Sequence, residues 1–166
     1  MDKSKKKKEF LDLMDKNQRM IHHICRAYSN NDDDYQDLFQ DILLQLWKSF
    51  ESFNNLSKFS TWMYRVSLNT AISTIRKAKN NITHVELDKV HGLSSEPEKD
   101  IDADVKLLYQ AIARLGKIDK AIILLYLEEK SYDEIADILG ISNSNAGVRI
   151  NRAKSKLEKM LQPYFT

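Results

Sequence analysis

A run of basic, amide and hydroxyl side chains lies near the end of the chain. Between residues 142 and 162 there are five basic residues and one acidic residue. Side chains of these types can hydrogen-bond base edges and neutralise phosphates, so the pattern predicts a surface that contacts DNA. On an ideal helix of about 100° per residue, most of them share a polar face. The expected contact residues are Ser144, Asn145, Val148, Arg149, Asn151, Arg152 and Lys156.

A second cationic stripe lies in the first half of the chain. Its members, on one side of a predicted helix and just before it, are Lys58, Arg65, Asn69 and Arg76. Trp62 lies beside them and Phe59 begins the helix. Aromatic rings among cations are typical of single-stranded or distorted DNA sites, where exposed bases stack on the rings. The spacing fits equally well a helix in which Trp62 and Tyr64 belong to the core and the cations are only solvated.

An acidic face forms a third candidate site. Asp37, Gln40 and Asp41 lie on the side of a predicted helix opposite its apolar residues. Like charges four residues apart cost a helix a few tenths of a kcal/mol, so this pair is not explained by helix stability. The face could meet a basic surface of a partner protein, although solvated charge is the commoner explanation of such pairs.

The elements that position these residues are helices. Ser131-Tyr-Asp-Glu134 has the form of a capping box, and Gly140 is placed to end that helix in a left-handed conformation. A second helix, capped by Ser142 or Ser144, is expected to run to about Leu161, before Pro163. A short helix, a glycine turn and a second helix describe a helix-turn-helix. Such geometry also occurs in helical bundles that bind nothing, with a solvated basic face.

Composition supports an all-α fold of two small domains. Of the 166 residues, 42% are hydrophobic, with four glycines and two prolines, and helical spacing recurs almost throughout. We expect a disordered basic tail over residues 1–8, a helical domain over 9–80, a flexible acidic linker over 81–104 and a helix-turn-helix domain over 105–166. The net charge of +2 is the sum of +4 over residues 1–80, −4 over 81–110 and +2 over 111–166.

Several classes of protein are excluded by what the sequence lacks. One cysteine allows no disulfide framework and no multi-cysteine zinc site. No apolar run approaches the ~18 residues of a membrane span, and the start does not resemble a secretory signal, so we expect a cytoplasmic protein without membrane insertion. His22, His23 and Cys25 form a poor metal cluster, since adjacent residues point in different directions on a helix. We therefore predict no enzyme, no catalytic or metal site and no cofactor.

The motifs resemble those of a known family. Asp37-Leu-Phe-Gln-Asp41, Leu46-Trp-Lys and Phe59-Ser-Thr-Trp-Met-Tyr-Arg65, followed by Asn69-Thr-Ala, are similar to region 2 of bacterial RNA polymerase sigma factors of the small extracytoplasmic-function (ECF) group in the sigma-70 family. The second half is similar to their region 4. Its matching motifs are Ala121-Ile-Ile-Leu-Leu-Tyr-Leu, Ser131-Tyr-Asp-Glu-Ile-Ala136, Leu139-Gly-Ile and Val148-Arg-Ile-Asn-Arg-Ala-Lys154.

This resemblance implies a role for each surface. Asp37, Gln40 and Asp41 would bind the coiled coil of the largest subunit of core RNA polymerase. The stripe from Lys58 to Arg76, with Phe59 and Trp62, would open and read the minus-10 promoter element as a separated strand. The helix-turn-helix would read the minus-35 element as duplex DNA. The polymerase flap and an anti-sigma factor would be further partners.

Two departures and one competing hypothesis accompany the resemblance. Many relatives have Leu-Pro where this chain has Leu115-Gly116, and Gly147 replaces a residue that often contacts bases, so no minus-35 preference can be transferred. The main alternative is an autonomous helix-turn-helix regulator that binds operator DNA without core polymerase. Such proteins usually dimerise, but the sequence shows no heptad seam for a dimer. A protein-binding adaptor is the third alternative.

Overall fold

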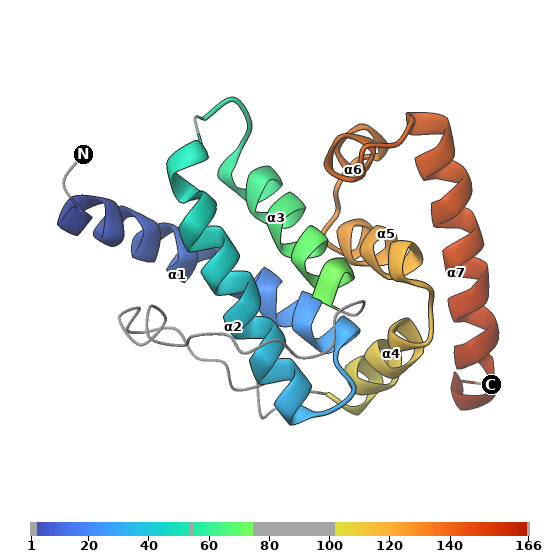
Figure 1. Ribbon diagram of the computed structural model, residues 1–166. Coiled ribbons are helices and arrows are strands. Elements are labelled where there is room, and N and C mark those ends of the chain that lie inside the picture. The colour runs from blue at the N-terminus through green and yellow to red at the C-terminus, as the bar shows by residue number, and fades with distance from the viewer. Residues whose placement is uncertain (1–2, 54, 75–101, 166) are drawn as a thin grey trace.

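The computed structural model describes residues 3–53, 55–74 and 102–165, which form helices and connecting turns without any strand. This confirms the predicted all-α fold, and Figure 1 shows the arrangement. The elements in chain order are α1 (Lys3–Tyr28), α2 (Asp32–Ser49), the 3-10 helix η1 (Phe50–Ser52), α3 (Phe59–Thr74), α4 (Ala103–Ala113), α5 (Lys117–Leu127), α6 (Tyr132–Leu139) and α7 (Asn143–Phe165).

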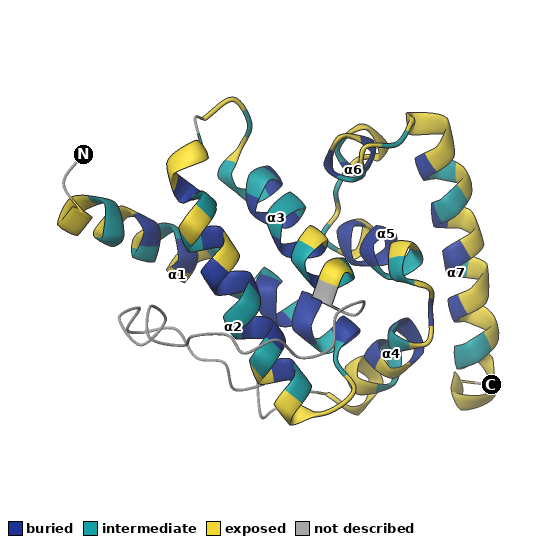
Figure 2. Ribbon diagram, viewed as in Figure 1, coloured by how far each residue is buried: buried dark blue, intermediate teal, exposed yellow. Residues whose placement is uncertain are grey.

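The first three α-helices pack on one another as a bundle. Asn31 caps α2, because its side chain accepts a hydrogen bond from the Asp34 amide at 2.8 Å. The inner face of α1 is fully buried between its neighbours at Phe10, Met14, Ile21, Ile24 and Cys25, and Figure 2 shows buried residues along the inner faces of the bundle. This packing leaves the polar faces of α2 and α3 as the surfaces on which contacts with a partner can be made.

The N-terminal lysines differ from the prediction of a disordered tail over residues 1–8. From Lys3 onward they form the first turns of α1. Lys6 is the physical reason: its ammonium pairs with Glu51 and lies 5.4 Å from the centre of the Trp47 ring. A long aliphatic stem that packs on an aromatic side chain orders a charged residue whose head still reaches solvent.

The second bundle contains the predicted helix-turn-helix, α6 and α7. Both halves of the capping box are present: Glu134 N–H donates to Ser131 Oγ at 3.1 Å, and Ser131 N–H donates to Glu134 Oε1 at 3.1 Å. Gly140 has φ of 70°, in the left-handed region, and the next amide, of Ile141, donates to Ala136 O. These local bonds fix the sharp turn that delivers the chain into α7.

Replacing Ser131 with alanine is expected to lower the free energy of unfolding by about 1 kcal/mol, the usual worth of an N-cap. The pKa of Glu134 lies below its ordinary value, chiefly because its carboxylate accepts the Ser131 N–H bond. The stability that comes from the Glu134 carboxylate is therefore fully present above the ordinary glutamate pKa of about 4.3, and it is lost as the pH falls through the lower folded-state pKa. Urea unfolding at pH 7 measures the effect. Ser155→Ala, at an exposed position within α7, is the control and should cause no loss.

Helix α7 buries one stripe and exposes the opposite one. Ala146, Ile150, Ala153 and Leu157 face inward and are buried, as the helical spacing predicts, whereas Leu161 is only partly buried. Ser142 supplies the cap, since its hydroxyl accepts the Asn145 amide at 3.1 Å. The helix continues through Pro163 to Phe165, beyond the predicted end. A proline so near a C-terminus removes one intrahelical bond at most, so the last turn can still form.

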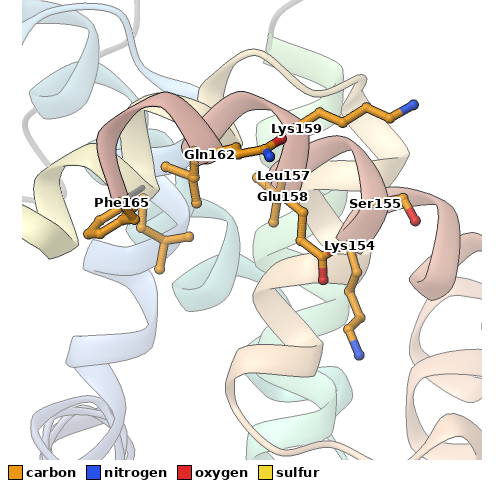
Figure 3. A pocket seen from close by; sticks show the side chains of 9 residues that line it. Lys154, Ser155, Leu157, Glu158, Lys159, Gln162 and Phe165 are labelled. Carbon is orange, nitrogen blue, oxygen red and sulfur yellow. The ribbon is translucent and has the colours of Figure 1, made fainter.

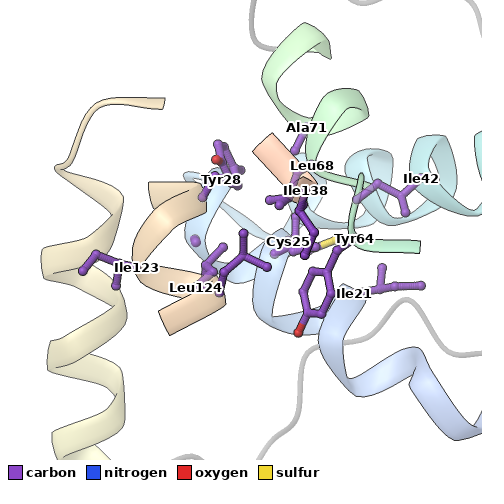
Figure 4. Packing of buried hydrophobic residues seen from close by; sticks show 14 of the residues in the cluster. Ile21, Cys25, Tyr28, Ile42, Tyr64, Leu68, Ala71, Ile123, Leu124 and Ile138 are labelled. Carbon is purple, nitrogen blue, oxygen red and sulfur yellow. The ribbon is translucent and has the colours of Figure 1, made fainter. Parts of the chain in front are cut away.

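The two bundles form one continuous body with a shared core. Helix α6 packs on α3, while α4 and α5 pack on α1. Figure 4 shows Ile138 of α6 beside Leu68 of α3, close to Cys25 of α1. The Tyr28 hydroxyl of α1 donates to the Lys117 carbonyl of α5 at 2.6 Å. The segment predicted to be a flexible linker lies mostly outside the described residues.

Candidate nucleic-acid interface

The outer face of α7 is open to solvent along its length. Ser144, Asn145, Asn151, Arg152 and Lys156 are exposed, and Arg149 is partly exposed. Val148 is 48% exposed, which is high for an apolar side chain in a folded domain. The capping box and the glycine turn hold α7 as the second helix of the motif. Its first turns therefore project from the body with amide and hydroxyl groups foremost, as a helix entering a major groove requires.

Gly147 has a structural reason for its missing side chain. A Cβ at this position would lie 3.3 Å from the ring of Tyr132, at the start of α6. The absence of a side chain at Gly147 lets the first turns of α7 approach the start of α6 closely. The same end is held by a hydrogen bond from Asn143 to the Asp133 carboxylate. The position therefore contributes to the angle between the helices, and it has no side chain to place on DNA.

Two cations of α7 already have partners within the domain. Lys156 Nζ lies 3.1 Å from Asp119 Oδ2 of α5, and Lys154 Nζ donates to the Tyr126 hydroxyl at 3.2 Å. The predicted phosphate contact by Lys156 therefore competes with an ion pair whose carboxylate is largely buried. The contacts of Asp119 and Tyr126 with α7 could not be predicted from the sequence, because both residues belong to α5, which is far from α7 in the chain.

The aromatic residues of α3 and the preceding segment form a cluster around Trp62. The ring centres of Phe50, Phe53 and Phe59 lie 6.3, 5.2 and 5.4 Å from that of Trp62. Trp62 remains partly exposed, whereas Tyr64 is only 1% exposed. Tyr64 therefore belongs to the core, whereas Trp62 packs in the aromatic cluster and stays partly exposed. Burial raises the pKa of Tyr64 far above its ordinary value.

The polar stripe of α3 is only partly open. Lys58 and Asn69 are exposed, Phe59 is partly exposed, and Arg76 lies outside the described residues. Arg65 is engaged: its guanidinium donates to the backbone carbonyl of Asp137 at 3.2 Å and lies 3.4 Å from the Asp137 carboxylate. Asp137 belongs to α6, so one of the predicted minus-10 residues contacts the helix-turn-helix.

A hollow of about 440 Å³ adjoins the Trp62 cluster. It lies between the segment that joins η1 to α3 on one side and α6 on the other. One of its lining residues, Leu56, is 87% exposed. The hollow offers an aromatic wall beside hydroxyl groups and a guanidinium, a combination that can stack and hydrogen-bond a nucleobase. The residues that line it are Ser52, Phe53, Leu56, Ser57, Trp62, Arg65 and Asp137.

The acidic face of α2 is less open than its sequence suggests. Asp37, Gln40 and Asp41 are all partly buried. Gln40 Oε1 is inaccessible to solvent and accepts no hydrogen bond from the described residues. The three side chains do lie on the predicted side of the helix, since Leu38, Ile42 and their neighbours face the core. The face is a partly buried acidic strip of the first bundle.

The fold places His22, His23 and Cys25 in three different surroundings. His22 is buried, where Nδ1 bonds the Tyr35 hydroxyl and the ring stacks on Phe39. His23 Nδ1 lies 2.8 Å from Glu128 Oε1. Cys25 is in the core, where burial raises the pKa of its thiol well above the usual range. In residues 3–53, 55–74 and 102–165, no three His, Cys, Asp or Glu side chains are grouped to hold a metal ion.

A groove of about 650 Å³ runs along the C-terminal half of α7 (Figure 3). Leu108 of α4 and Leu157 and Phe165 of α7 give it an apolar lining, while Lys154 and Lys159 lie among its charged residues. Phe165 is 56% exposed, as an apolar side chain without a covering element would be. No helix in the described part of the chain has the length and apolar character needed to cross a membrane.

Sequence reasoning missed the residues that come from irregular segments or distant helices. Ser52, Phe53 and Ser57 line the hollow, but they lie at the end of η1 and in the segment that follows it, where no periodic pattern marks a face. Asp137 is an ordinary exposed acid in the sequence of α6, and only the packing of α6 on α3 brings it to Arg65. Fold and interface together define a helix-turn-helix DNA-binding protein with a second helical domain packed against the first.

Comparisons with known proteins agree with this class. The Sigma-70 region 2 model matches residues 13–81, and the Sigma-70 region 4 model matches residues 106–157. The chain is 31% identical over 169 residues to the ECF RNA polymerase sigma factor SigW of Bacillus subtilis. The aligned region covers 92% of this chain and 89% of the relative. It is 28% identical to the ECF RNA polymerase sigma-E factor of Haemophilus influenzae, across 95% of this chain and 89% of the relative.

Solved structures share the fold. The sigma factor RpoE in complex with the anti-sigma factor NepR, from Bartonella quintana, aligns with a TM-score of 0.72 at 22% identity, over 93% of this chain and 98% of that one. CnrH in complex with the cytosolic domain of CnrY aligns with a TM-score of 0.64 at 21% identity, over 93% and 88%. The chain belongs to the extracytoplasmic-function group of the sigma-70 family of RNA polymerase sigma factors.

Proposed function

We propose that this protein binds core RNA polymerase, recognises minus-10 and minus-35 promoter elements and directs the start of transcription. The observation that carries the proposal is the open face of α7, held by the helix-turn-helix with amide, hydroxyl and cationic side chains outward. These groups suit duplex DNA. Within this face we assign minus-35 contacts to Ser144, Asn145, Val148, Arg149, Asn151, Arg152 and Lys156.

The first bundle supplies the other two assignments. We assign the acidic strip formed by Asp37, Gln40 and Asp41 to the coiled coil of the largest polymerase subunit, because a carboxylate surface complements a basic partner. The hollow beside Trp62 supports a role in holding the opened minus-10 strand, since unpaired bases stack on aromatic rings. The residues assigned to that strand are Lys58, Phe59, Trp62, Arg65, Asn69 and Arg76.

Two further partners follow from the second bundle and from the relatives. The apolar groove between α4 and α7 offers a surface for the polymerase flap, and it lies away from the first turns of α7 that would meet DNA. Two of the structural neighbours are complexes with a second protein chain, RpoE with the anti-sigma factor NepR and CnrH with the cytosolic domain of CnrY. An anti-sigma factor is therefore included among the proposed partners of this chain.

The experiment is run-off transcription from a promoter library with core polymerase, with and without this protein. We expect discrete transcripts only when both are present, and weak binding of the same promoters by the protein alone. Tight duplex binding by the isolated protein that core enzyme does not change would instead support an autonomous regulator. The match of residues 13–81 to sigma region 2 makes that alternative less favoured, since an autonomous regulator needs no such domain.

A further inference from the structure

One apolar side chain lies at the centre of the open face of α7. On an ideal helix of about 100° per residue, the direction opposite to Val148 lies within about 20° of the buried residues Ile150 and Leu157. Val148 therefore points straight away from the core, on the outer side of α7 in Figure 2, and it is 48% exposed. Core packing does not explain a branched apolar side chain at this position.

The helix neighbours of Val148 are polar. Residues three and four positions apart lie side by side on a helix surface. At these positions around Val148 are Ser144, Asn145, Asn151 and Arg152, all of them exposed. Their hydroxyl, amide and guanidinium groups can bond to donors and acceptors on base edges or to phosphates. Val148 can do neither, so the face consists of an apolar spot within a ring of hydrogen-bonding groups.

The preceding position, Gly147, leaves room beside Val148. Gly147 has no side chain, and a Cβ there would lie 3.3 Å from the ring of Tyr132. Tyr132 is itself 42% exposed. The surface between Val148 and Tyr132 is therefore formed by bare backbone, and a group as small as a methyl can approach the Val148 side chain from this flank.

The chemistry of the major groove limits what can lie against such a spot. Among the groups by which base pairs differ there, the 5-methyl group of thymine is the apolar one, and the others are hydrogen-bond donors and acceptors. A donor or acceptor placed against Val148 would lose its water without gaining a hydrogen bond, which is unfavourable. A methyl group in the same place instead buries apolar surface on both sides of the contact.

We propose that Val148 recognises the 5-methyl group of one thymine in the minus-35 element, so that an apolar contact rather than a hydrogen bond sets the preferred base pair at that position. This inference rests on the proposed minus-35 role of α7, and it adds the chemical identity of one base in the element. The polar side chains around Val148 bond phosphates and neighbouring base edges, which fixes the register of the helix in the groove.

The test removes the methyl group from the DNA and the apolar group from the protein. Duplexes are selected from a random library by the full chain, once with core polymerase and once alone. Every thymine of the selected minus-35 element, on either strand, is then replaced in turn by deoxyuridine, which lacks only the 5-methyl group. At one position we expect the affinity, measured by fluorescence anisotropy, to fall by about 2- to 5-fold, as for burial of one methyl group.

The protein variants assign that methyl group to Val148. Val148→Ser should bind the unmodified element more weakly and should lose most of its response to deoxyuridine at this position. Val148→Ile keeps an apolar branched side chain and should keep the response. Val105→Ser makes the same exchange at a valine of α4 that is 39% exposed, and it should behave as the parent does. Thermal melting of each variant shows that it is folded.

A gain of binding provides an independent measurement. If the identified thymine and its adenine are exchanged for cytosine and guanine, binding should weaken. Methylation of that cytosine at carbon 5 returns the methyl group to the same place in the groove. It should recover about 2- to 5-fold in affinity for the parent and little for Val148→Ser.

Two results would overturn the proposal. One is that no deoxyuridine replacement in the selected element weakens binding by the parent. The other is that Val148→Ser responds to the same replacement as strongly as the parent does. Failure of the proposed function has a different signature, because the chain alone would then select and bind its duplexes as well as it does with core polymerase. The deoxyuridine series is in that case still measured on the chain alone.

Discussion

Replacing Asp37 and Asp41 together with lysine is expected to abolish co-purification with core RNA polymerase. The double change replaces two negative charges with two positive ones on a strip that we assign to a basic surface, so attraction becomes repulsion, and like charges across an interface cost several kcal/mol. At about 1.4 kcal/mol for each factor of ten, the affinity should fall by at least a hundredfold. Co-purification and a binding titration with fluorescent core enzyme measure the loss.

Because this strip is partly buried, the experiment needs controls that show that the lysine variant still folds. Asp41 Oδ1 is inaccessible to solvent, so a lysine at that position can disturb α2 itself. Asp37→Asn with Asp41→Asn keeps the shape and should still weaken binding, though less. Asp12→Lys with Asp15→Lys makes the same four-charge change at exposed positions of α1 and should leave binding intact. Normal co-purification of a folded lysine variant would refute the assignment of α2.

Replacing Arg152 or Asn151 with alanine is expected to lower transcription from minus-35-dependent promoters. Each side chain is exposed on the open face of α7, and a good base contact is worth about 1–3 kcal/mol. The corresponding reduction is roughly 5- to 150-fold in promoter affinity for each variant. Because neither residue is buried, the melting temperature should stay within a degree or two of the parent. Run-off transcription on promoters selected by the parent protein provides the measurement.

A matched control is available on the same helix. Lys159→Ala removes one positive charge, as Arg152→Ala does, but it lies two turns further along and lines the groove between α4 and α7. Because this groove is assigned to the polymerase flap, the quantity compared is the ratio of transcription from promoters with and without the minus-35 element, which Lys159→Ala should change far less. Equal losses from Lys159→Ala and Arg152→Ala would mean that α7 contributes general positive charge rather than base contacts. If the Arg152→Ala and Asn151→Ala variants both transcribe as the parent does, a purely protein-binding role for the domain would be favoured.

The near-zero net charge of the protein has a consequence for both experiments. Cationic side chains gather on α7, whereas carboxylates form the strip on α2. A single-residue exchange therefore changes one surface strongly and the total charge little. Salt dependence should accordingly follow the surface tested: DNA binding should weaken steeply with added salt, because phosphate contacts release counterions. The buried contacts between the bundles should respond far less.

The helices and the turn of the helix-turn-helix were predictable because their causes are local. The apolar periodicity gave the buried stripe of α7, and Ser131, Glu134 and Gly140 made the bonds and turn expected of them. Such signals act over three to five residues, within one helical turn. The prediction for residues 3–8 was wrong because Lys6 is ordered by Trp47 and Glu51, which are more than forty positions away.

The sequence by itself determined the helical class, the helix-turn-helix, the family and the residue types on each surface. Only the tertiary structure decided how open those surfaces are. It buried Tyr64 and left Trp62 partly exposed, paired Lys156 with Asp119, and set Asp137 against Arg65, 72 residues away. The physical reason is that exposure and charge pairing depend on contacts between helices. A local sequence pattern does not predict which side chain from a distant helix will accept a hydrogen bond from a given residue.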